Sequence, residues 1–316
     1  MVVKLYKDRK KGAGAVKRVV SVSLGSSKRD KATEAEFLGE KFIIERRGTD
    51  GDYNKALQVL KELDGKVDAI GLGGIDVYLY AGGRRYAIKD GLRLLQAVKI
   101  TPAVDGSGLK NTLEREVVRE LARMGIITPK SKVLLVSAVD RFGMAEALAE
   151  TGAEVIFGDL IFALGIPIPI KKISTLNFLA AILLPIITKL PFQILYPTGK
   201  EQEVREKKRK NDRYYHWADI IAGDYLYIKK HLPERIDGKI ILTNTTTPED
   251  VEELKAKGAK MLVTTTPVLN GRSFGTNVME GVLLTLLNKK WEEVTPEDYL
   301  RLLKELGFKP NIIELN

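Results

Sequence analysis

The chain has 316 residues, of which 44% are apolar, so it is long enough for two domains or one large α/β unit. It has no cysteine and only two histidines, which excludes thiol nucleophiles, disulfides and Cys-ligated zinc, and no metal site is predicted. The formal net charge of +10 indicates either an ordinary basic surface or an anionic partner. Nucleic acid is not expected, because the sequence shows no DNA- or RNA-binding motif.

A repeated unit organises the chain: a short apolar run ends in Gly, Asp, Ser, Thr or Asn, and a helix-like segment follows. Buried parallel strands are short apolar runs, and open α/β sheets bind ligands beyond the carboxyl ends of such strands. The pattern therefore predicts an α/β fold with two Rossmann-like domains, whose mostly parallel sheets face a central cleft. The predicted order is a basic lead-in (1–16), an N-terminal α/β substrate domain (17–128), a C-terminal Rossmann-like domain (129–288), and a C-terminal helix and tail (289–316).

The N-terminal half begins with a basic segment that lacks the apolar core and cleavage site of a secretion signal, so a cytoplasmic location is expected. The spacing of apolar residues predicts helices over 32–38 and 54–63. Gly82 and Gly83 separate two short alternating runs, and this pattern predicts a β-hairpin.

The loop at 105–112 combines two glycines with donor side chains at the start of a predicted long helix. Such a loop suits an anion or a hydroxylated ligand, because glycine allows close approach and the helix start presents free amides. We interpret Lys110 as an acid–base group with Asp105 or Asp140 as its partner; a capped helix with an exposed lysine is the alternative. The predicted substrate-binding residues of this loop are Ser107, Asn111 and Thr112.

The second half opens with a strand, a turn and a helix start over 133–143, an arrangement that suits phosphate. An aspartate ends the next strand, where a dinucleotide site places a carboxylate on the ribose. Ala138 and Asp140 stand where the dinucleotide fingerprint has glycine, and an ordinary turn or an Arg141–Asp140 pair is the alternative. The predicted cofactor-binding residues are Ser137, Asp140, Arg141, Gly143 and Asp159.

An insertion interrupts the repeated unit over 160–213. Residues 160–197 are strongly apolar with five prolines, and 201–213 are mostly basic. Lysines and prolines break the apolar run, so it is too short to span a bilayer. Three alternatives stay open: a core segment or homodimer face, a peripheral membrane contact, or a lid over an apolar ligand. The second alternative would make the protein membrane-associated.

Two later strands end in threonine runs, at 243–247 and 264–266. The predicted substrate-binding residues of this region are Thr245, Thr265 and Arg272. The arginine stands between two glycines before a helix, and it suits a carboxylate or phosphate. The tetrapeptide Thr-Pro-Glu-Asp occurs at 247–250 and 295–298, where it predicts helix N-caps.

Nine segments are distributed along nearly the whole chain: VSVSLGSSKRDK, GTDGD, GLGGID, TPAVDGSGLKNTLE, VSAVDRFGMAEAL, GDLIFALGIP, ADIIAGD, TNTTT and VTTTPVLNGRSFGTNVMEG. Together they resemble the bacterial family called quinate 5-dehydrogenase. The resemblance implies an oxidoreductase that transfers a hydride between NAD or NADP and a hydroxylated carboxylate such as quinate. It also implies a Lys–Asp pair at the cleft, the role that we assign to Lys110 and Asp105.

Three functions therefore stay open. The first is the NAD(P)-dependent dehydrogenase just described. The second is a transferase or other enzyme acting on a phosphorylated or lipid-linked substrate at a membrane surface, which the insertion and the basic charge favour. The third is a non-enzymatic sensor whose cleft closes on a small anion.

Overall fold

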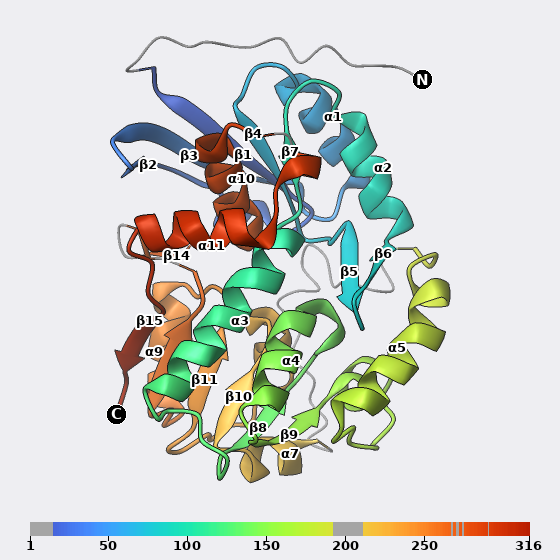
Figure 1. Ribbon diagram of the computed structural model, residues 1–316, viewed down its shortest axis with the longest axis vertical. Helices are drawn as coiled ribbons and strands as arrows, with labels where there is room; N and C mark the ends of the chain where they lie inside the picture. The colour runs from blue at the N-terminus through green and yellow to red at the C-terminus, as the bar shows by residue number, and fades with distance from the viewer. Residues whose placement is uncertain (1–14, 192–210, 267, 270–271, 274, 290) are drawn as a thin grey trace.

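The computed structural model describes residues 15–191, 211–266, 275–289 and 291–316, together with the backbone of 268–269 and 272–273. The predicted lead-in 1–16 lies almost entirely outside these residues. The chain forms two α/β lobes, which Figure 1 shows one above the other. Helix α3 (Ser107–Arg123) begins between the lobes and packs against helices of both.

The N-terminal lobe is built on a five-stranded sheet. Its strands are β1 (Lys17–Ser23), β2 (Lys31–Phe37), β3 (Glu40–Gly48), β4 (Ala69–Gly73) and β7 (Ala103–Val104). Their order is β2-β3-β1-β4-β7, and all neighbours are parallel except β2, which pairs antiparallel with β3 at the edge. The helices of this lobe are α1 (Tyr53–Leu63), α2 (Lys89–Ala97), α10 (Thr276–Leu287) and α11 (Pro296–Glu305). Both α1 and α10 pack against β1.

The C-terminal lobe is built on a six-stranded sheet. Its strands are β8 (Lys132–Leu135), β9 (Glu154–Phe157), β10 (Ile220–Ala222), β11 (Ile240–Thr243), β12 (Met261–Thr264) and β15 (Asn311–Glu314). Their order is β15-β12-β11-β10-β8-β9, and only β15 is antiparallel. The helices of this lobe are α4 (Phe142–Glu150), α5 (Ile173–Ile187), α7 (Asp212–Trp217), α8 (Tyr225–His231) and α9 (Pro248–Ala256).

The two sheets share one topology. Numbered along the chain, the parallel strands of the C-terminal lobe run in the order 2-1-3-4-5, and those of the N-terminal lobe run 2-1-3-4. The prediction of an α/β fold with two domains and mostly parallel sheets is therefore confirmed. The Rossmann-like designation is too specific, because the Rossmann order is 3-2-1-4-5-6. In each lobe the order reverses between the first and third parallel strands, which are β1 and β4 in one and β8 and β10 in the other.

The lobes exchange segments near the C-terminus, in a way that the predicted domain boundaries miss. Helix α10 lies within 129–288, yet it packs against β1 and β4 of the N-terminal lobe. Strand β15 lies within the predicted tail 289–316, yet it completes the C-terminal sheet. Sequence patterns indicate that a segment has an apolar face, but they do not indicate which sheet that face covers.

Local predictions are confirmed at several elements and wrong at one. The helix α1, the hairpin of β5 (Tyr78–Ala81) and β6 (Arg84–Ala87), and the Thr-Pro-Glu-Asp capping boxes of α9 and α11 are all present. The helix predicted over 32–38 is instead β2. Burial alternates along β2, and Leu38 and Gly39 have positive φ in the tight turn to β3. The few apolar residues of this run fit both the helical period of 3.6 and the strand period of 2, and pairing with β3 decides in favour of the strand.

The predicted insertion 160–213 is described up to residue 191 and again from 211. Its main element is α5, a 15-residue apolar helix that stands at the right of Figure 1. Among the described residues, no helix combines the length and apolar character needed to cross a membrane.

Candidate functional site

A cavity of about 700 Å³ lies between the lobes, at the carboxyl ends of the parallel strands. Ser23 and Gly73 end β1 and β4 on one side, and Ser137 and Asp224 follow β8 and β10 on the other. These four strands flank the two points where the strand order reverses. Open α/β sheets bind ligands at such points, so the cavity combines two binding crevices that face one another.

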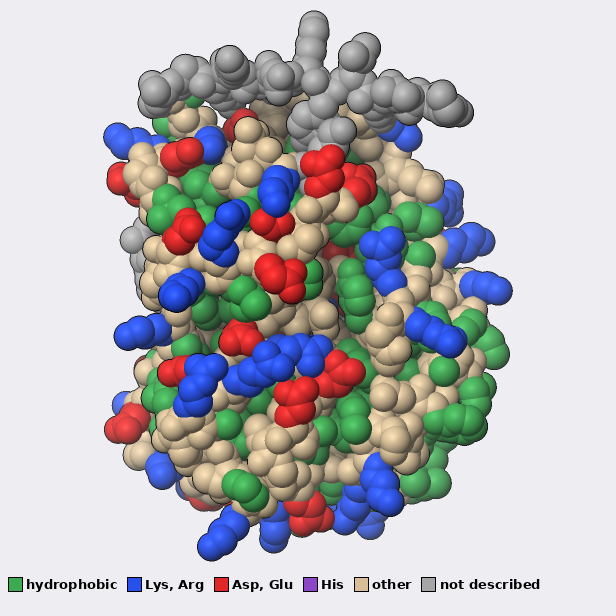
Figure 2. Space-filling model, in the orientation of Figure 1, with side chains coloured by type: hydrophobic (Ala, Val, Ile, Leu, Met, Phe, Trp, Pro, Cys, Tyr) green, Lys and Arg blue, Asp and Glu red, His purple; other side chains and the backbone are tan. Residues whose placement is uncertain are grey.

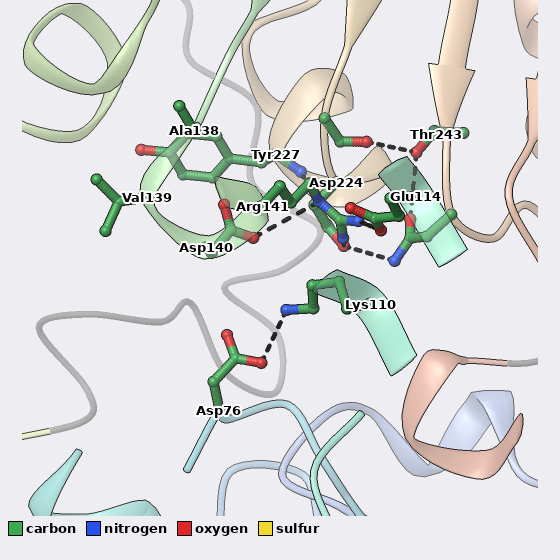
Figure 3. Close-up of polar contacts among 12 residues, drawn as sticks. Asp76, Lys110, Glu114, Ala138, Val139, Asp140, Arg141, Asp224, Tyr227 and Thr243 are labelled. Atoms are coloured by element: carbon green, nitrogen blue, oxygen red, sulfur yellow. Dashed lines mark hydrogen bonds and ion pairs between the residues drawn. The ribbon is translucent and has the colours of Figure 1, made fainter. Parts of the chain in front are cut away.

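The centre of the cavity holds an ion pair between the lobes. Lys110 Nζ of α3 lies 2.9 Å from Oδ1 of Asp76, which follows β4, and both side chains are largely buried (Figure 3). Burial alone would lower the pKa of Lys110, but the carboxylates of Asp76 and Asp140 raise it above its ordinary value. A lysine held in its charged form suits the binding and orientation of a ligand, so this geometry does not favour the predicted role of Lys110 as an acid–base group.

Asp105, the predicted partner of Lys110, has another role. Its Oδ2 accepts the backbone amides of Val77 (2.6 Å) and Tyr78 (3.0 Å). Its Oδ1 accepts both the amide (3.0 Å) and the hydroxyl (2.6 Å) of Ser107. Four hydrogen bonds occupy this carboxylate, which therefore fixes the start of α3 against the segment before β5. We correct the predicted pair: Asp76 is the partner of Lys110.

Arg141 forms a second charged cluster, within the C-terminal lobe. Its side chain is 2% exposed and forms ion pairs with Glu114 of α3, with Asp224 (Nη2 to Oδ2, 3.1 Å) and with Asp140 (Nε to Oδ2, 3.6 Å) (Figure 3). Burial alone would lower the pKa of Arg141, but the three carboxylates raise it. Asp224 also caps α8 and accepts the side-chain amide of Asn244 at 2.9 Å. The guanidinium is thus fixed in place and permanently charged at the cavity wall.

Asp159 occupies the predicted phosphate position. Its Oδ1 accepts the backbone amides of Ala138 and Val139, each at 3.0 Å. These are amides that a dinucleotide site would offer to the pyrophosphate, and here a carboxylate already uses them. Burial raises the pKa of Asp159 to about 6, and its Oδ2 has no hydrogen-bond partner among the described residues. NAD or NADP binding stays an untested prediction, and this geometry does not favour it.

Several predicted residues hold helices together instead of facing the cavity. At Gly143 of α4, a Cβ atom would stand 2.4 Å from the backbone oxygen of Asn111, so glycine allows α3 and α4 to approach closely. Thr112 Oγ1 donates to a carbonyl in the preceding turn of α3, and the Ser107 hydroxyl donates to Asp105. The cofactor role predicted for the glycine and the substrate roles predicted for the other three are therefore not supported.

Seven predicted residues do line the cavity: Asp105, Lys110, Ser137, Asp140, Arg141, Asp159 and Thr245. Thr265 is completely buried at the end of β12 and does not line it. The side chain of Arg272 lies outside the described residues.

Sequence reasoning missed three carboxylates of this site: Asp76, Glu114 and Asp224. Asp76 ends a glycine cluster that suggests tight packing, and Asp224 follows Gly223 at a strand end without further signal. Glu114 lies inside a helix, 27 positions from the arginine that it pairs with. The strand-end rule could have found Asp224, whereas nothing local in the sequence reveals the pairing of Glu114.

A group of four basic residues, which we call the basic strip, lines the N-terminal side of the cavity. It consists of Lys28, Arg29, Lys31 and Arg46. Arg46 is fixed by Asp30 (2.7 Å) and by the Ser23 hydroxyl (3.0 Å). Burial and then the positive charge of Arg29 lower the pKa of Arg46. No ion pair of Arg29 occurs within the part of the chain that the structure describes, so the strip presents positive charge to the cavity.

Helix α5 supplies an apolar side of the cavity. Leu176, Leu179, Leu183, Leu184 and Ile187 line it, together with Ala180. These positions fall on one stripe of the helix, because their spacing follows the three-and-four pattern of a single helical face. The cavity is therefore charged at its centre, basic on the N-terminal side and apolar along α5.

A family model described as Domain of unknown function (DUF8754) matches residues 108–315, and another described as Domain of unknown function (DUF8753) matches residues 18–105. No curated protein matches the chain by sequence.

Solved structures similar to the chain include several sugar-binding proteins. A galactofuranose binding protein is 12% identical (TM-score 0.37, covering 92% of this chain and 98% of that one). The 5-methylthioribose transporter solute binding protein from Thermotoga lettingae is 10% identical (TM-score 0.39, covering 94% of this chain and 85% of that one). AraP, an arabinose binding protein from Geobacillus stearothermophilus, is 11% identical (TM-score 0.39, covering 95% of this chain and 97% of that one). At these values the similarities carry no information about the ligand of this chain.

These findings overturn the assignment to the quinate 5-dehydrogenase family. The family models that match residues 108–315 and 18–105 are the two domains of unknown function, and neither is the quinate 5-dehydrogenase family. The predicted NAD(P)-dependent dehydrogenase activity is therefore wrong as well. The short motifs that carry the resemblance are turns at strand ends. In this chain the residues of these turns serve helix packing, helix capping and ion pairing.

Proposed function

We propose that this chain, which belongs to the family described as Domain of unknown function (DUF8754), binds a small hydroxylated anion reversibly and without converting it. One observation carries the proposal. The crevices at both strand-order reversals open into a single cavity, and charged side chains are already fixed around it. Such preorganisation lowers the cost of ordering side chains when a ligand binds.

The carboxylates of the C-terminal lobe favour a ligand with hydroxyl donors. Asp140 Oδ1 and Asp159 Oδ2 are buried and have no hydrogen-bond partner among the described residues. A buried acceptor without a donor costs about 1–3 kcal/mol, and a ligand hydroxyl at either oxygen would recover this energy.

The basic strip favours a ligand that also carries negative charge. Arg29 has no counter-ion among the described side chains, and its charge adds to that of Arg46 nearby. A phosphate or carboxylate would neutralise this excess, since guanidinium groups bind such anions through two parallel hydrogen bonds.

The charged state of Lys110 and Arg141 favours ligand binding by these two residues over proton transfer by them. General acid–base catalysis is most efficient when the catalytic pKa lies near the working pH. The carboxylates around Lys110 and Arg141 raise the pKa of each away from that range. The described lining of the cavity contains no cysteine or histidine. These groups suit the recognition of a ligand by two lobes, as in the predicted non-enzymatic sensor.

Isothermal titration calorimetry with glycerol 3-phosphate, the smallest probe that carries both features, tests the proposal. We expect saturable binding, with weaker binding of glycerol and of inorganic phosphate. Arg29→Gln should weaken binding by about ten-fold or more, because a hydrogen bond to a charged group contributes about 1.5–3 kcal/mol. Arg301→Gln, which removes an equal charge from an exposed position on α11, should bind like the wild type. Equal weakening by both variants would contradict a specific anion site.

The same titration includes NAD, NADP and quinate, with absorbance followed at the reduced-nicotinamide band. Turnover of any of these would contradict binding without conversion. Absence of binding by every probe would remove the proposal.

A second proposal concerns the partner of the outer face of α5. Phe178, Ile182 and Ile186 are 65%, 51% and 62% exposed on the side away from the cavity, where apolar side chains gather in Figure 2. Lys171, Lys172 and Lys189, all exposed, flank the helix. An apolar face between cations suits the interface of an anionic bilayer, so we propose that α5 contacts such a membrane peripherally.

Co-sedimentation with phosphatidylserine vesicles tests this contact. The protein should pellet with these vesicles but much less with phosphatidylcholine vesicles, and Ile182→Asn should reduce pelleting. Ile100→Asn, at an exposed isoleucine of the N-terminal lobe, serves as the control. Failure to pellet would refute the contact. If the wild type is a dimer and the Ile182→Asn variant is a monomer, the face is instead assigned to a second copy of the chain.

A further inference from the structure

We infer that the natural ligand is an amphiphile, whose anionic head lies among the charged groups of the cavity and whose alkyl chain lies along α5. This inference rests on the proposed function, and it names the chemical class of the ligand. It accounts for the apolar side of the cavity, which a small hydroxylated anion alone would leave in contact with water.

The inner face of α5 is built for contact with an apolar group. The six cavity-lining positions extend from Leu176 to Ile187, about 16 Å along the helix axis. Leu176 and Leu184 are buried against the protein, whereas Leu179, Leu183 and Ile187 are only half-buried. Three large apolar side chains thus line the cavity without full coverage by other side chains. Each would leave water if an alkyl chain lay beside it.

The head and the chain would occupy one continuous cavity. Basic-strip residues and the lining residues of α5 belong to the same cavity as Lys110 and Arg141. Leu160, Leu164 and Ile170 extend the apolar lining from the segment before α5. A ligand that was polar throughout would place hydroxyls or charge against this lining with no hydrogen-bond partner, which is unfavourable.

Helix α5 also explains the predicted insertion. Leu176, Ala180 and Leu184 of α5 belong to the hydrophobic core, as the core alternative for 160–213 predicts, and they also line the cavity, as the lid alternative predicts. The packing of α5 fits a cavity wall, since the helix is apolar on both faces and its buried residues Leu176, Ala180 and Leu184 all lie on the inner face.

Calorimetry with glycerol 3-phosphate and its 1-hexanoyl ester, below the concentration at which the ester forms micelles, tests the inference. Each methylene removed from water tightens binding by up to about four-fold. We therefore expect the ester to bind at least about ten-fold more tightly than glycerol 3-phosphate. Leu183→Asn should abolish most of this difference, measured as the ratio of the two affinities within that variant. The matched variant Ile182→Asn, one residue away on the outer face, should preserve the difference.

Each outcome decides between the proposals. Equal affinities for glycerol 3-phosphate and its ester would overturn the amphiphile while leaving the proposed function intact. Binding of neither would remove both. Equal affinity for uncharged 1-hexanoylglycerol would refute the anionic head. Loss of glycerol 3-phosphate binding in Leu183→Asn would show that the wall shapes the polar site, and it would also count against a separate chain subsite.

Discussion

Replacing Glu280 by glutamine should stabilise the protein above neutral pH and remove much of its pH dependence. Glu280 of α10 is completely buried, and its Oε1 accepts the hydroxyl of Tyr299 at 2.6 Å. Its Oε2 has no hydrogen-bond partner among the described residues. Burial, and then the nearby charge of Asp105, raise the pKa of Glu280 from 4.5 to about 7. The carboxyl is therefore protonated in the folded state over a range in which the unfolded chain ionises it.

The sign and size of the effect follow from this pKa. Between pH 4.5 and 7 the folded state binds a proton that the unfolded state has released, so the free energy of unfolding falls as the pH rises. A difference of about 2.5 pKa units corresponds to about 3 kcal/mol of lost stability above pH 7. Glutamine resembles the protonated acid in shape and charge. Glu280→Gln should thus match the wild type near pH 4.5 and exceed its stability by about 3 kcal/mol at pH 8.

Urea unfolding followed by circular dichroism from pH 4.5 to 8 measures this difference. Glu252→Gln serves as the matched control, since it removes an exposed carboxylate of α9 and should parallel the wild type. If Glu280→Gln lost stability between pH 5 and 8 as steeply as the wild type does, the reasoning about this buried carboxyl would be wrong.

Three further variants test helix packing, a buried ion pair and a helix cap, each by its urea midpoint. Gly143→Ala should destabilise by about 1–3 kcal/mol, because its Cβ would collide with the backbone of Asn111. Arg141→Met should destabilise by about 3–5 kcal/mol, because Glu114 stays buried without its partner; adding Glu114→Leu should recover much of the loss. Thr295→Ala removes the cap of α11 and should cost about 1 kcal/mol. An unchanged midpoint in any of the three would contradict the role given to that residue.

The sequence predicts where the site lies better than it predicts which residues form the site. Short apolar runs followed by polar clusters correctly indicate parallel strands, and the strand-end rule correctly places Asp140, Asp159 and Thr245 at one cavity. The rule works because the chain direction of a parallel strand fixes which end carries the ligand. It does not distinguish a carboxylate that faces a ligand from one, such as Asp105, that is occupied by backbone amides.

Long-range pairing explains what the sequence could not predict. The partner of Lys110 is Asp76, 34 positions away in the chain, and the partner of Arg141 is Glu114, inside a helix. No local period records either contact. The same limit applies to the edge strand β2, which takes its conformation from its neighbour β3, and to α10, which crosses back to the first lobe.

Hydrogen exchange with and without glycerol 3-phosphate tests most directly whether the ligand binds between the lobes. Binding should slow the exchange of amides at 73–76 in the N-terminal lobe and at 137–141 in the C-terminal lobe, because both segments line the cavity. Arg29→Gln should reduce both effects together at a fixed probe concentration. Slower exchange in one lobe only, or in segments away from the cavity, would contradict a ligand site shared by the two lobes.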